Sequence, residues 1–183
     1  MVERRTKAMR RRHWLFAMSI AIGVAGASWP KAQSPLFAWN VSQSVPVGLY
    51  LIAARQPSRG ELAALRLPEA IRSLADDRGY LQSRAVLMKP VAALAGDTVC
   101  RHGAIITING DPAAHALFAD TMGRPLPQWN GCQNLDDQQL FVLSKIQHSF
   151  DGRYFGLVDA RHVIGTAASV IVAAVLPSAT PQK

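Results

Sequence analysis

The sequence predicts a mostly β domain, an antiparallel coiled sheet or barrel with a short helical insertion, preceded by one N-terminal transmembrane helix. Three observations lead to this prediction. The 183 residues suffice for one well-buried domain with a short appendage. Residues 14–29 form an apolar stretch without any charged residue. After this stretch, short apolar runs alternate with Gly, Pro, Asn and Asp, which is typical of strands joined by tight turns.

The N-terminal residues predict a membrane topology. Residues 1–13 contain six Arg or Lys and one Glu, so they carry +5 of the formal net charge of +8. Because positive residues stay on the cytoplasmic side, we expect a cytoplasmic tail at 1–13, a transmembrane anchor at 14–30 and an exported domain after it. Trp14 and Trp29 at the two ends of the apolar stretch favour a retained anchor. The small residues at 25–28 leave a cleaved leader as the alternative.

Composition sets the remaining boundaries. Residues 31–39 are expected to be a membrane-proximal connector, with Phe37 and Trp39 resting at the bilayer surface. The folded domain is expected at 40–176 and a flexible tail at 177–183. The predicted strands are the apolar runs "GLYLIAA" (48–54), "ELAALRL" (61–67), "AVLMKPVAAL" (85–94), "TVCR" (98–101), "AIITING" (104–110), "QLFVLSK" (139–145), "YFGLV" (154–158) and "HVIGTAASVIVAAVL" (162–176).

Three segments depart from this strand pattern. The stretch "PEAIRSLADDRGY" (68–80) begins with Pro and Glu and stops at Gly, which predicts a short helix inserted between strands. The sequence "INGD" (108–111) predicts a tight hairpin, because Asn-Gly tolerates the positive φ values of the turn. Residues 111–134 are rich in Pro and Gly and are expected to be a long irregular excursion.

Cys100 and Cys132 are the two cysteines of the chain. An oxidising compartment would permit a bridge between them, closing a loop of about 30 residues and contributing roughly 3 to 4 kcal/mol. The alternative is two buried free thiols. Neither cysteine has the CxxC spacing of a metal or redox site.

Two hydroxyls and one amine are the candidate reactive groups. Ser42 and Ser44 lie two residues apart in "SQSVPVGLY", just before a proline, where a serine most often caps a turn. Lys89 lies among apolar residues, where burial would lower the pKa of the amine from about 10.4 toward 7 or 8, as a general base at neutral pH requires. The alternative is a lysine whose stem packs while its amine reaches water.

Four segments in order resemble the type I signal peptidase family, most closely its conjugative-transfer (TraF-like) branch. They are "SQSVPVGLY" at 42–50, "RGELAAL" at 59–65, "LMKPVAALAGDTV" at 87–99 and "SFDGRYFGLV" at 149–158, the last followed by "HVIGTA". The similarity extends from about Asn40 to Ala167, behind a basic N-terminus and one apolar segment. It implies a signal-peptidase-like domain.

The resemblance implies a serine endopeptidase that uses a Ser-Lys dyad. Ser44 would be the nucleophile, and Lys89 the general base that takes the serine proton and later returns a proton to the leaving amine. Ser42 would help to form the oxyanion hole beside the Ser44 amide. This chemistry requires no metal and no cofactor.

The last segment supplies the supporting groups that the resemblance implies. Ser149 matches a hydroxyl that orients the lysine, and Asp151 matches an acid that holds the site together through Arg153. For Asp151 we leave open a direct catalytic role and a scaffolding role. Two departures favour the TraF-like branch over a housekeeping enzyme: Pro90 follows the lysine in place of the usual arginine, and Ala95 replaces the proline of the family's "PGD".

The resemblance also implies partners and a location. We expect the catalytic domain in the periplasm of a bacterium, held at the inner-membrane lipid, and acting as a monomer without nucleic acid. The expected substrate is a membrane-inserted precursor protein, a propilin of a conjugation or type IV secretion apparatus, with cyclisation of the product in some members of the branch. The first alternative is general removal of signal peptides from preproteins. The second is a noncatalytic membrane-tethered assembly protein.

Other chemistries have weaker support in the sequence. A Ser-His-Asp site would have to use His148 and Asp151, which lie three residues apart in one segment. No HExxH motif is present, and the histidines at 102, 115, 148 and 162 are scattered. A self-cleaving DNA-binding repressor would need a helix-turn-helix domain where the apolar stretch at 14–29 lies.

Overall fold

The structure is a computed structural model, and it describes residues 37–42, 44–81 and 85–172. The chain divides into two compact units, Met1–Gln33 and Ser34–Lys183, and only the second contains described residues. The predicted cytoplasmic tail, transmembrane anchor and C-terminal tail therefore lie outside the described residues, as does most of the connector. In the described ranges, no helix has both the length and the apolar character needed to cross a bilayer.

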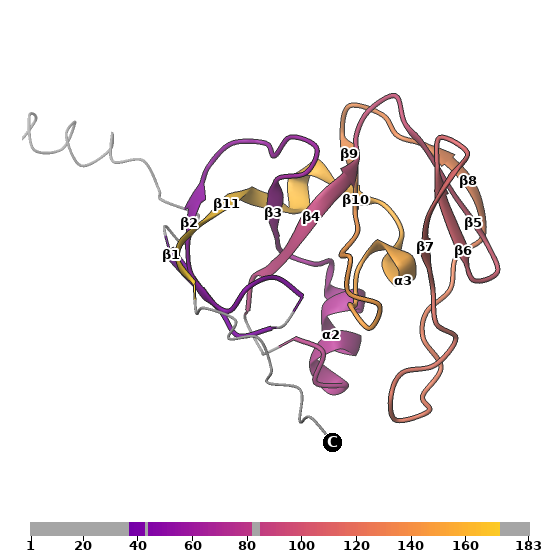
Figure 1. Cartoon of the computed structure of the whole chain (residues 1–183), viewed down its shortest axis with the longest axis horizontal. Helices are drawn as coiled ribbons and strands as arrows, with labels where there is room; N and C mark the ends of the chain where they lie inside the picture. The colour runs from indigo at the N-terminus through magenta and orange to yellow at the C-terminus, as the bar shows by residue number, and fades with distance from the viewer. Residues whose placement is uncertain (1–36, 43, 82–84, 173–183) are drawn as a thin grey trace, which may run out of the picture. The chain divides into compact units, whose positions relative to one another are not determined.

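The described residues form a mostly β fold of two antiparallel sheets, as predicted (Figure 1). The large sheet has the strand order β1-β2-β11-β3-β4-β9-β10, and the small sheet has the order β7-β6-β5-β8. The strands of the large sheet are β1 (Phe37–Asn40), β2 (Gly48–Ala53), β3 (Leu62–Leu65), β4 (Leu87–Ala93), β9 (Gln139–Val142), β10 (Val158–Asp159) and β11 (Val163–Val172). Those of the small sheet are β5 (Thr98–His102), β6 (Ile105–Ile108), β7 (Asp111–His115) and β8 (Gly131–Asn134).

The inner strand β4, which pairs with β3 on one side and with β9 on the other, is buried along most of its length. Its side chains contribute to cores on both faces of the sheet. Leu87 and Val91 belong to one buried cluster, and Met88 belongs to another with Tyr50 of β2. Lys89, which lies between these buried residues of β4, is itself buried.

The predicted helix and hairpin are confirmed. Helix α2 (Glu69–Asp77) begins after Pro68, and the chain turns away at Gly79, whose φ is 70°. Asn109 and Gly110 join β6 to β7 with φ values of 54° and 89°, as the Asn-Gly turn predicts.

Three predictions about elements need correction. The run 154–158 is not one strand: helix α3 (Gly152–Phe155) occupies its start, followed by the two-residue β10 and a 3₁₀ turn, η1 (Ala160–His162). The excursion at 111–134 begins and ends in strands, β7 and β8, because both pair with the small sheet. The end of the expected connector is strand β1, which pairs with β2 and so begins the sheet at Phe37.

Candidate active site

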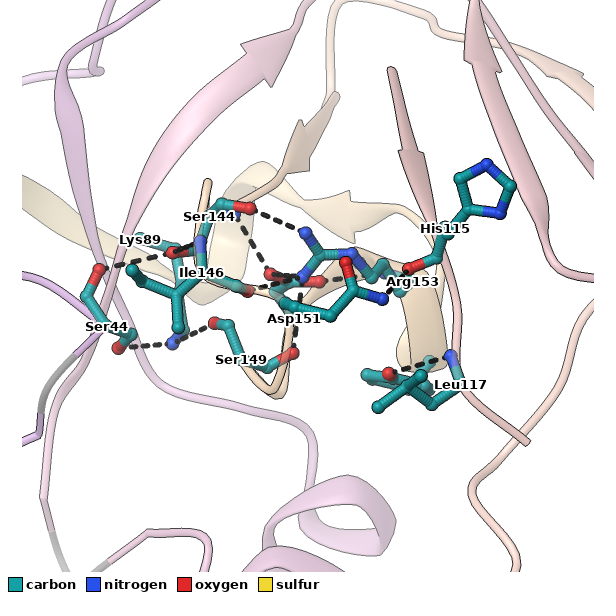
Figure 2. Close-up of polar contacts among 12 residues, drawn as sticks. Ser44, Lys89, His115, Leu117, Ser144, Ile146, Ser149, Asp151 and Arg153 are labelled. Carbon is teal, nitrogen blue, oxygen red and sulfur yellow. Dashed lines mark hydrogen bonds and ion pairs between the residues drawn. The ribbon is translucent and has the colours of Figure 1, made fainter. Parts of the chain in front are cut away.

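Lys89 and two serines from distant parts of the chain meet in one cluster of hydrogen bonds, which Figure 2 shows. Lys89 lies in β4, Ser44 in the turn between β1 and β2, and Ser149 just before α3. The Lys89 Nζ donates to Ser44 Oγ at 2.6 Å and to Ser149 Oγ at 2.7 Å. The lysine amine thus lies within proton-transfer distance of a hydroxyl.

The surroundings of Lys89 change its acidity. The residue is only 3% exposed, so the amine is largely shielded from bulk water. Burial lowers the pKa of Lys89 to about 8, while the Asp151 carboxylate opposes this effect and the Arg153 guanidinium adds to it. With a pKa of about 8, roughly one lysine in ten is neutral at pH 7, and the neutral amine is able to accept a proton.

Asn40, at the end of β1, organises the turn that carries Ser44. Its side-chain amide donates to the carbonyl oxygens of Ser42 (2.8 Å), Val45 (2.9 Å) and Pro46 (3.0 Å). Its Oδ1 accepts from the backbone N–H of Ser42 at 3.1 Å. Tyr50 adds a hydrogen bond from its hydroxyl to the Pro46 carbonyl at 2.7 Å. Sequence reasoning missed Asn40, although an Asn just before a Ser- and Pro-containing turn is a common signal for such contacts.

The second hydroxyl of the motif lies beside the first. Ser42 Oγ is 3.0 Å from Ser44 Oγ and also donates to Asn40 Oδ1 at 3.0 Å. Rotation about χ1 lets a serine hydroxyl redirect its hydrogen to a new acceptor. An oxygen that becomes negative next to Ser44 would be such an acceptor.

Asp151 and Arg153 form a buried ion pair that does not contact the dyad directly. The exposed fractions of their side chains are 0% and 3%, and Arg153 Nη1 lies 2.8 Å from Asp151 Oδ2. Burial raises the pKa of Asp151, whereas the Arg153 guanidinium and the Ser144 amide oppose this. Asp151 receives hydrogen bonds from Arg153 and from the Ser144 N–H, and none from Lys89. This arrangement supports the scaffolding role for Asp151.

Ser144 connects this ion pair to the candidate nucleophile, and sequence reasoning missed it. Its Oγ donates to the carbonyl oxygen of Ser44 at 3.2 Å, and its N–H donates to Asp151 Oδ2 at 3.0 Å. Its own carbonyl accepts from Arg153 Nη2 at 2.7 Å. Nothing in "VLSK" marks this serine, because all three contacts depend on segments that meet only in the folded chain.

The cluster opens into a cleft of about 500 Å³ whose lining is mostly apolar. Ser42, Ser44 and Lys89 lie in its wall. Another part of the wall is a clasp between the residues after α2 and the loop after β7. In this clasp the Tyr80 hydroxyl and Arg124 Nε donate to Asp120 Oδ2, at 2.5 and 2.6 Å. These contacts lower the pKa of Asp120, the Tyr80 hydrogen bond most.

The rival Ser-His-Asp arrangement is not formed. His148 lines the cleft and is exposed, whereas Asp151 is buried against Arg153. The hydrogen bonds of Ser44 Oγ lead instead to Lys89 and Ser42.

The two cysteines form a disulfide between β5 and β8, where Cys100 and Cys132 are directly opposite each other. Nearby, His102 Nε2 lies 3.9 Å from Cys132 Sγ. The ligand atoms of these three residues are within 4.8 Å of one another, but both sulfur atoms are engaged in the disulfide. A bonded sulfur lacks the thiolate that metal binding requires.

Comparison with known proteins adds an independent line. A family model described as "Signal peptidase, peptidase S26" matches residues 11–172. The plasmid transfer protein TraF of Escherichia coli is 32% identical over 143 residues, which cover 72% of this chain and 81% of that protein. The probable conjugal transfer protein TraF of Sinorhizobium fredii (strain NBRC 101917 / NGR234) is 31% identical over 163 residues, covering 82% and 83%. A crystal structure of a signal peptidase I from Enterococcus faecalis V583 aligns with 62% of this chain and 98% of that chain, at a TM-score of 0.35 and 19% identity.

Proposed function

The chain belongs to the peptidase S26 signal peptidase family, and from this premise we propose that it is a serine endopeptidase with a Ser44-Lys89 dyad. The observation that carries the proposal is the 2.6 Å contact between Lys89 Nζ and Ser44 Oγ, made by a lysine residue that is only 3% exposed. A solvent-exposed Ser-Lys pair would not support the proposal, because a hydrated lysine stays protonated at neutral pH and so cannot accept the serine proton.

The proposed reaction begins with a neutral Lys89. Its Nζ takes the proton of Ser44 Oγ while the oxygen attacks the scissile carbonyl carbon and the carbonyl π electrons move to oxygen. The second contact of the amine, to Ser149 Oγ at 2.7 Å, holds it in the correct direction for this transfer. Ser42 redirects its hydroxyl to the developing oxyanion, and a well-placed donor of this kind is worth roughly 3 to 4 kcal/mol.

The tetrahedral intermediate then collapses. The C–N bond breaks, the Lys89 ammonium gives its proton to the leaving amine, and an ester of Ser44 with the N-terminal product remains. Lys89, neutral again, activates the nucleophile that releases this ester. With water the product is a free carboxylate, and with an amine of the substrate chain the product is a cyclic amide.

For the substrate, we propose an exported, membrane-inserted precursor that is cut after small residues, because shallow apolar pockets accept Ala and reject larger side chains. The two relatives named for plasmid or conjugal transfer support a precursor of a conjugation or type IV secretion apparatus, such as a propilin. General removal of signal peptides is the second candidate, which the family description favours.

The dyad is tested by replacing its two members in the full-length protein in membranes. Ser44→Ala and Lys89→Met should each reduce processing of a co-expressed precursor by at least about 10³-fold, because removing either group stops the same step. Arg161→Lys, an exposed change on η1, is the matched control and should process normally. Processing by either dyad variant at the wild-type rate would contradict the mechanism. The mass of the mature product distinguishes hydrolysis from cyclisation, which yields a product lighter by one water.

We also propose that the domain lies at the periplasmic surface of the inner membrane. Strands β1, β2 and β11 are adjacent and contain no Asp, Glu, Lys or Arg. Their exposed side chains include Phe37 (57%), Trp39 (63%) and Ile171 (63%), and exposed apolar side chains gathered in this way mark a protein or membrane interaction site. This surface includes Phe37 and Trp39, which lie at the end of the expected connector.

The topology is tested with a phosphatase that is active only in the periplasm, fused after residue 183. We expect an active fusion that stays in the membrane fraction after a carbonate wash. An inactive fusion, or release into the soluble fraction, would contradict the membrane location and leave the dyad unaffected.

A further inference from the structure

The small sheet contacts the turn that carries the ion pair through two side chains. Arg101, on β5, donates from Nη1 to the carbonyl oxygen of Arg153 at 2.5 Å. Trp129, just before β8, donates from Nε1 to the carbonyl oxygen of Gly152 at 3.0 Å. Two consecutive carbonyls of α3 are thus held by donors from the other sheet.

Arg101 is unusual because it is a fully buried cation without a carboxylate partner in the described part of the chain. Its other contacts are with the carbonyl oxygens of Gly103 (2.9 Å) and Pro127 (3.4 Å), and its Nη2 has no hydrogen-bond partner. A buried guanidinium that is held only by carbonyls is costly in free energy, and an apolar side chain would serve stability better. This free-energy cost suggests that Arg101 serves to place its N–H donors against the α3 carbonyl.

Arg153, whose carbonyl is held by Arg101, also contacts residues that bind the proposed catalytic groups. Arg153 binds Asp151 and the carbonyl of Ser144, and Ser144 donates to the Ser44 carbonyl. Arg153 Nη1 also lies 3.5 Å from the carbonyl oxygen of Ser149, and the Ser149 hydroxyl accepts a hydrogen bond from Lys89. Figure 2 shows these side chains in one continuous row. A shift of α3 would therefore reach both the amine and the nucleophile.

The disulfide joins β5, which bears Arg101, to β8, which begins just after Trp129. Cys100 directly precedes Arg101, and Cys132 lies three residues after Trp129. Strand β8 is at the edge of the small sheet and pairs with β5 alone. The disulfide thus keeps the chain segment after Trp129 attached to the strand of Arg101.

We propose that Arg101 and Trp129 are positioning residues for the Ser44-Lys89 dyad, kept in register by the disulfide; this proposal rests on the proposed function. They hold α3 so that Arg153, Asp151 and Ser149 keep water away from the lysine amine and keep it directed at Ser44.

The test uses two variants in the full-length protein. Trp129→Phe keeps an aromatic ring beside Phe141, whose ring centroid is 6.3 Å from that of Trp129, and removes the N–H donor together with one ring of the indole. Arg101→Lys keeps the charge and loses the forked donor. Each should lower kcat about five- to tenfold with KM unchanged, as for the loss of one positioning hydrogen bond. Each should also raise the apparent pKa of the rate, because water then reaches the amine.

The control Arg161→Lys should leave kcat and the pH profile at wild-type values. If Arg101→Lys fails to fold, Trp129→Phe decides the question by itself. A wild-type kcat in Trp129→Phe would overturn the proposal. A reduced kcat with an unchanged apparent pKa would also overturn it, because that result indicates a role in stability alone.

The disulfide is tested with the double variant Cys100→Ser, Cys132→Ser. It should reproduce the lower kcat and the raised apparent pKa, and a wild-type profile would overturn the part that the disulfide plays. These outcomes are distinct from failure of the proposed function, in which Ser44→Ala would still process the precursor.

Discussion

Lys89 shows how the surroundings of a single residue set its chemistry. The side chain has the same amine as every other lysine, yet it is 3% exposed and bound by two hydroxyls. Burial outweighs the attraction of Asp151, so the pKa falls to about 8. The consequence is an amine that is partly neutral near pH 7, as the proposed role of general base requires.

This pKa predicts the pH dependence of processing. Because the neutral amine is the active form, kcat/KM should rise with pH up to about 8 and fall roughly tenfold per pH unit on acidification below about 7. The measurement is the initial rate of precursor cleavage in detergent between pH 5 and 9. An acid limb that disappears on replacement of His148 would instead assign the proton transfer to histidine.

At the scale of elements, the segment from Ser144 to Gly156 serves as a frame for the amine. The Asp151 side chain accepts from the Arg153 N–H and so caps α3, and α3 packs closely on β9. Gly152 permits this approach: a Cβ there would lie 2.5 Å from Phe141 Cε2 and 2.7 Å from the Val142 carbonyl oxygen. A glycine is thus required between the two members of the ion pair.

We predict that Gly152→Ala pushes α3 away from β9. Overpacking of this kind should destabilise the protein by about 1 to 3 kcal/mol and should lower kcat, because Arg153 and Ser149 move with α3. Urea unfolding and precursor cleavage measure the two effects. Ser73→Ala, on the exposed face of α2, is the control and should change neither. An unchanged unfolding midpoint for Gly152→Ala would show that α3 has more room than its packing indicates.

At the scale of the whole molecule, the site joins segments that are far apart in the chain. Ser44 and Lys89 are 45 residues apart, and Ser149 is 60 residues beyond Lys89. Burying the Lys89 ammonium therefore lowers the free energy of unfolding of the whole domain. Removing that ammonium should relieve the cost, although it abolishes the proposed activity.

This trade-off predicts a pH-dependent difference in stability. The amine has a pKa of about 8 in the folded protein and 10.5 as its ordinary value, so between these pH values the unfolded state holds more protons and stability rises with pH. The full rise corresponds to about 3 kcal/mol. Urea unfolding at pH 7.5 and 10.5 should show this gain in the wild type and lack it in Lys89→Met. Equal gains in both proteins would mean that the amine is hydrated in the folded state.

The local pattern of the chain was enough to predict the mostly β antiparallel fold, the helix after Pro68 and the Asn109-Gly110 hairpin. These features depend on periodicity and on backbone preferences that each segment carries by itself. The same pattern did not predict α3, because its helical turn depends on a cap by Asp151 and on close contact with β9. It also did not predict that Phe37 begins the sheet, since an edge strand forms only when its partner is present.

For the site, the sequence by itself determined the candidate groups: the resemblance of its motifs to the signal peptidase family singled out Ser44, Lys89 and Ser149. Only the tertiary structure decided that Lys89 is buried and that its amine points at Ser44. It also brought in Ser144 and Arg101, whose contacts reach across the fold, and Asn40, which organises the turn of Ser44. The physical reason is that burial and hydrogen-bond direction are properties of the packed chain, whereas a motif records only which side chains are available to be packed.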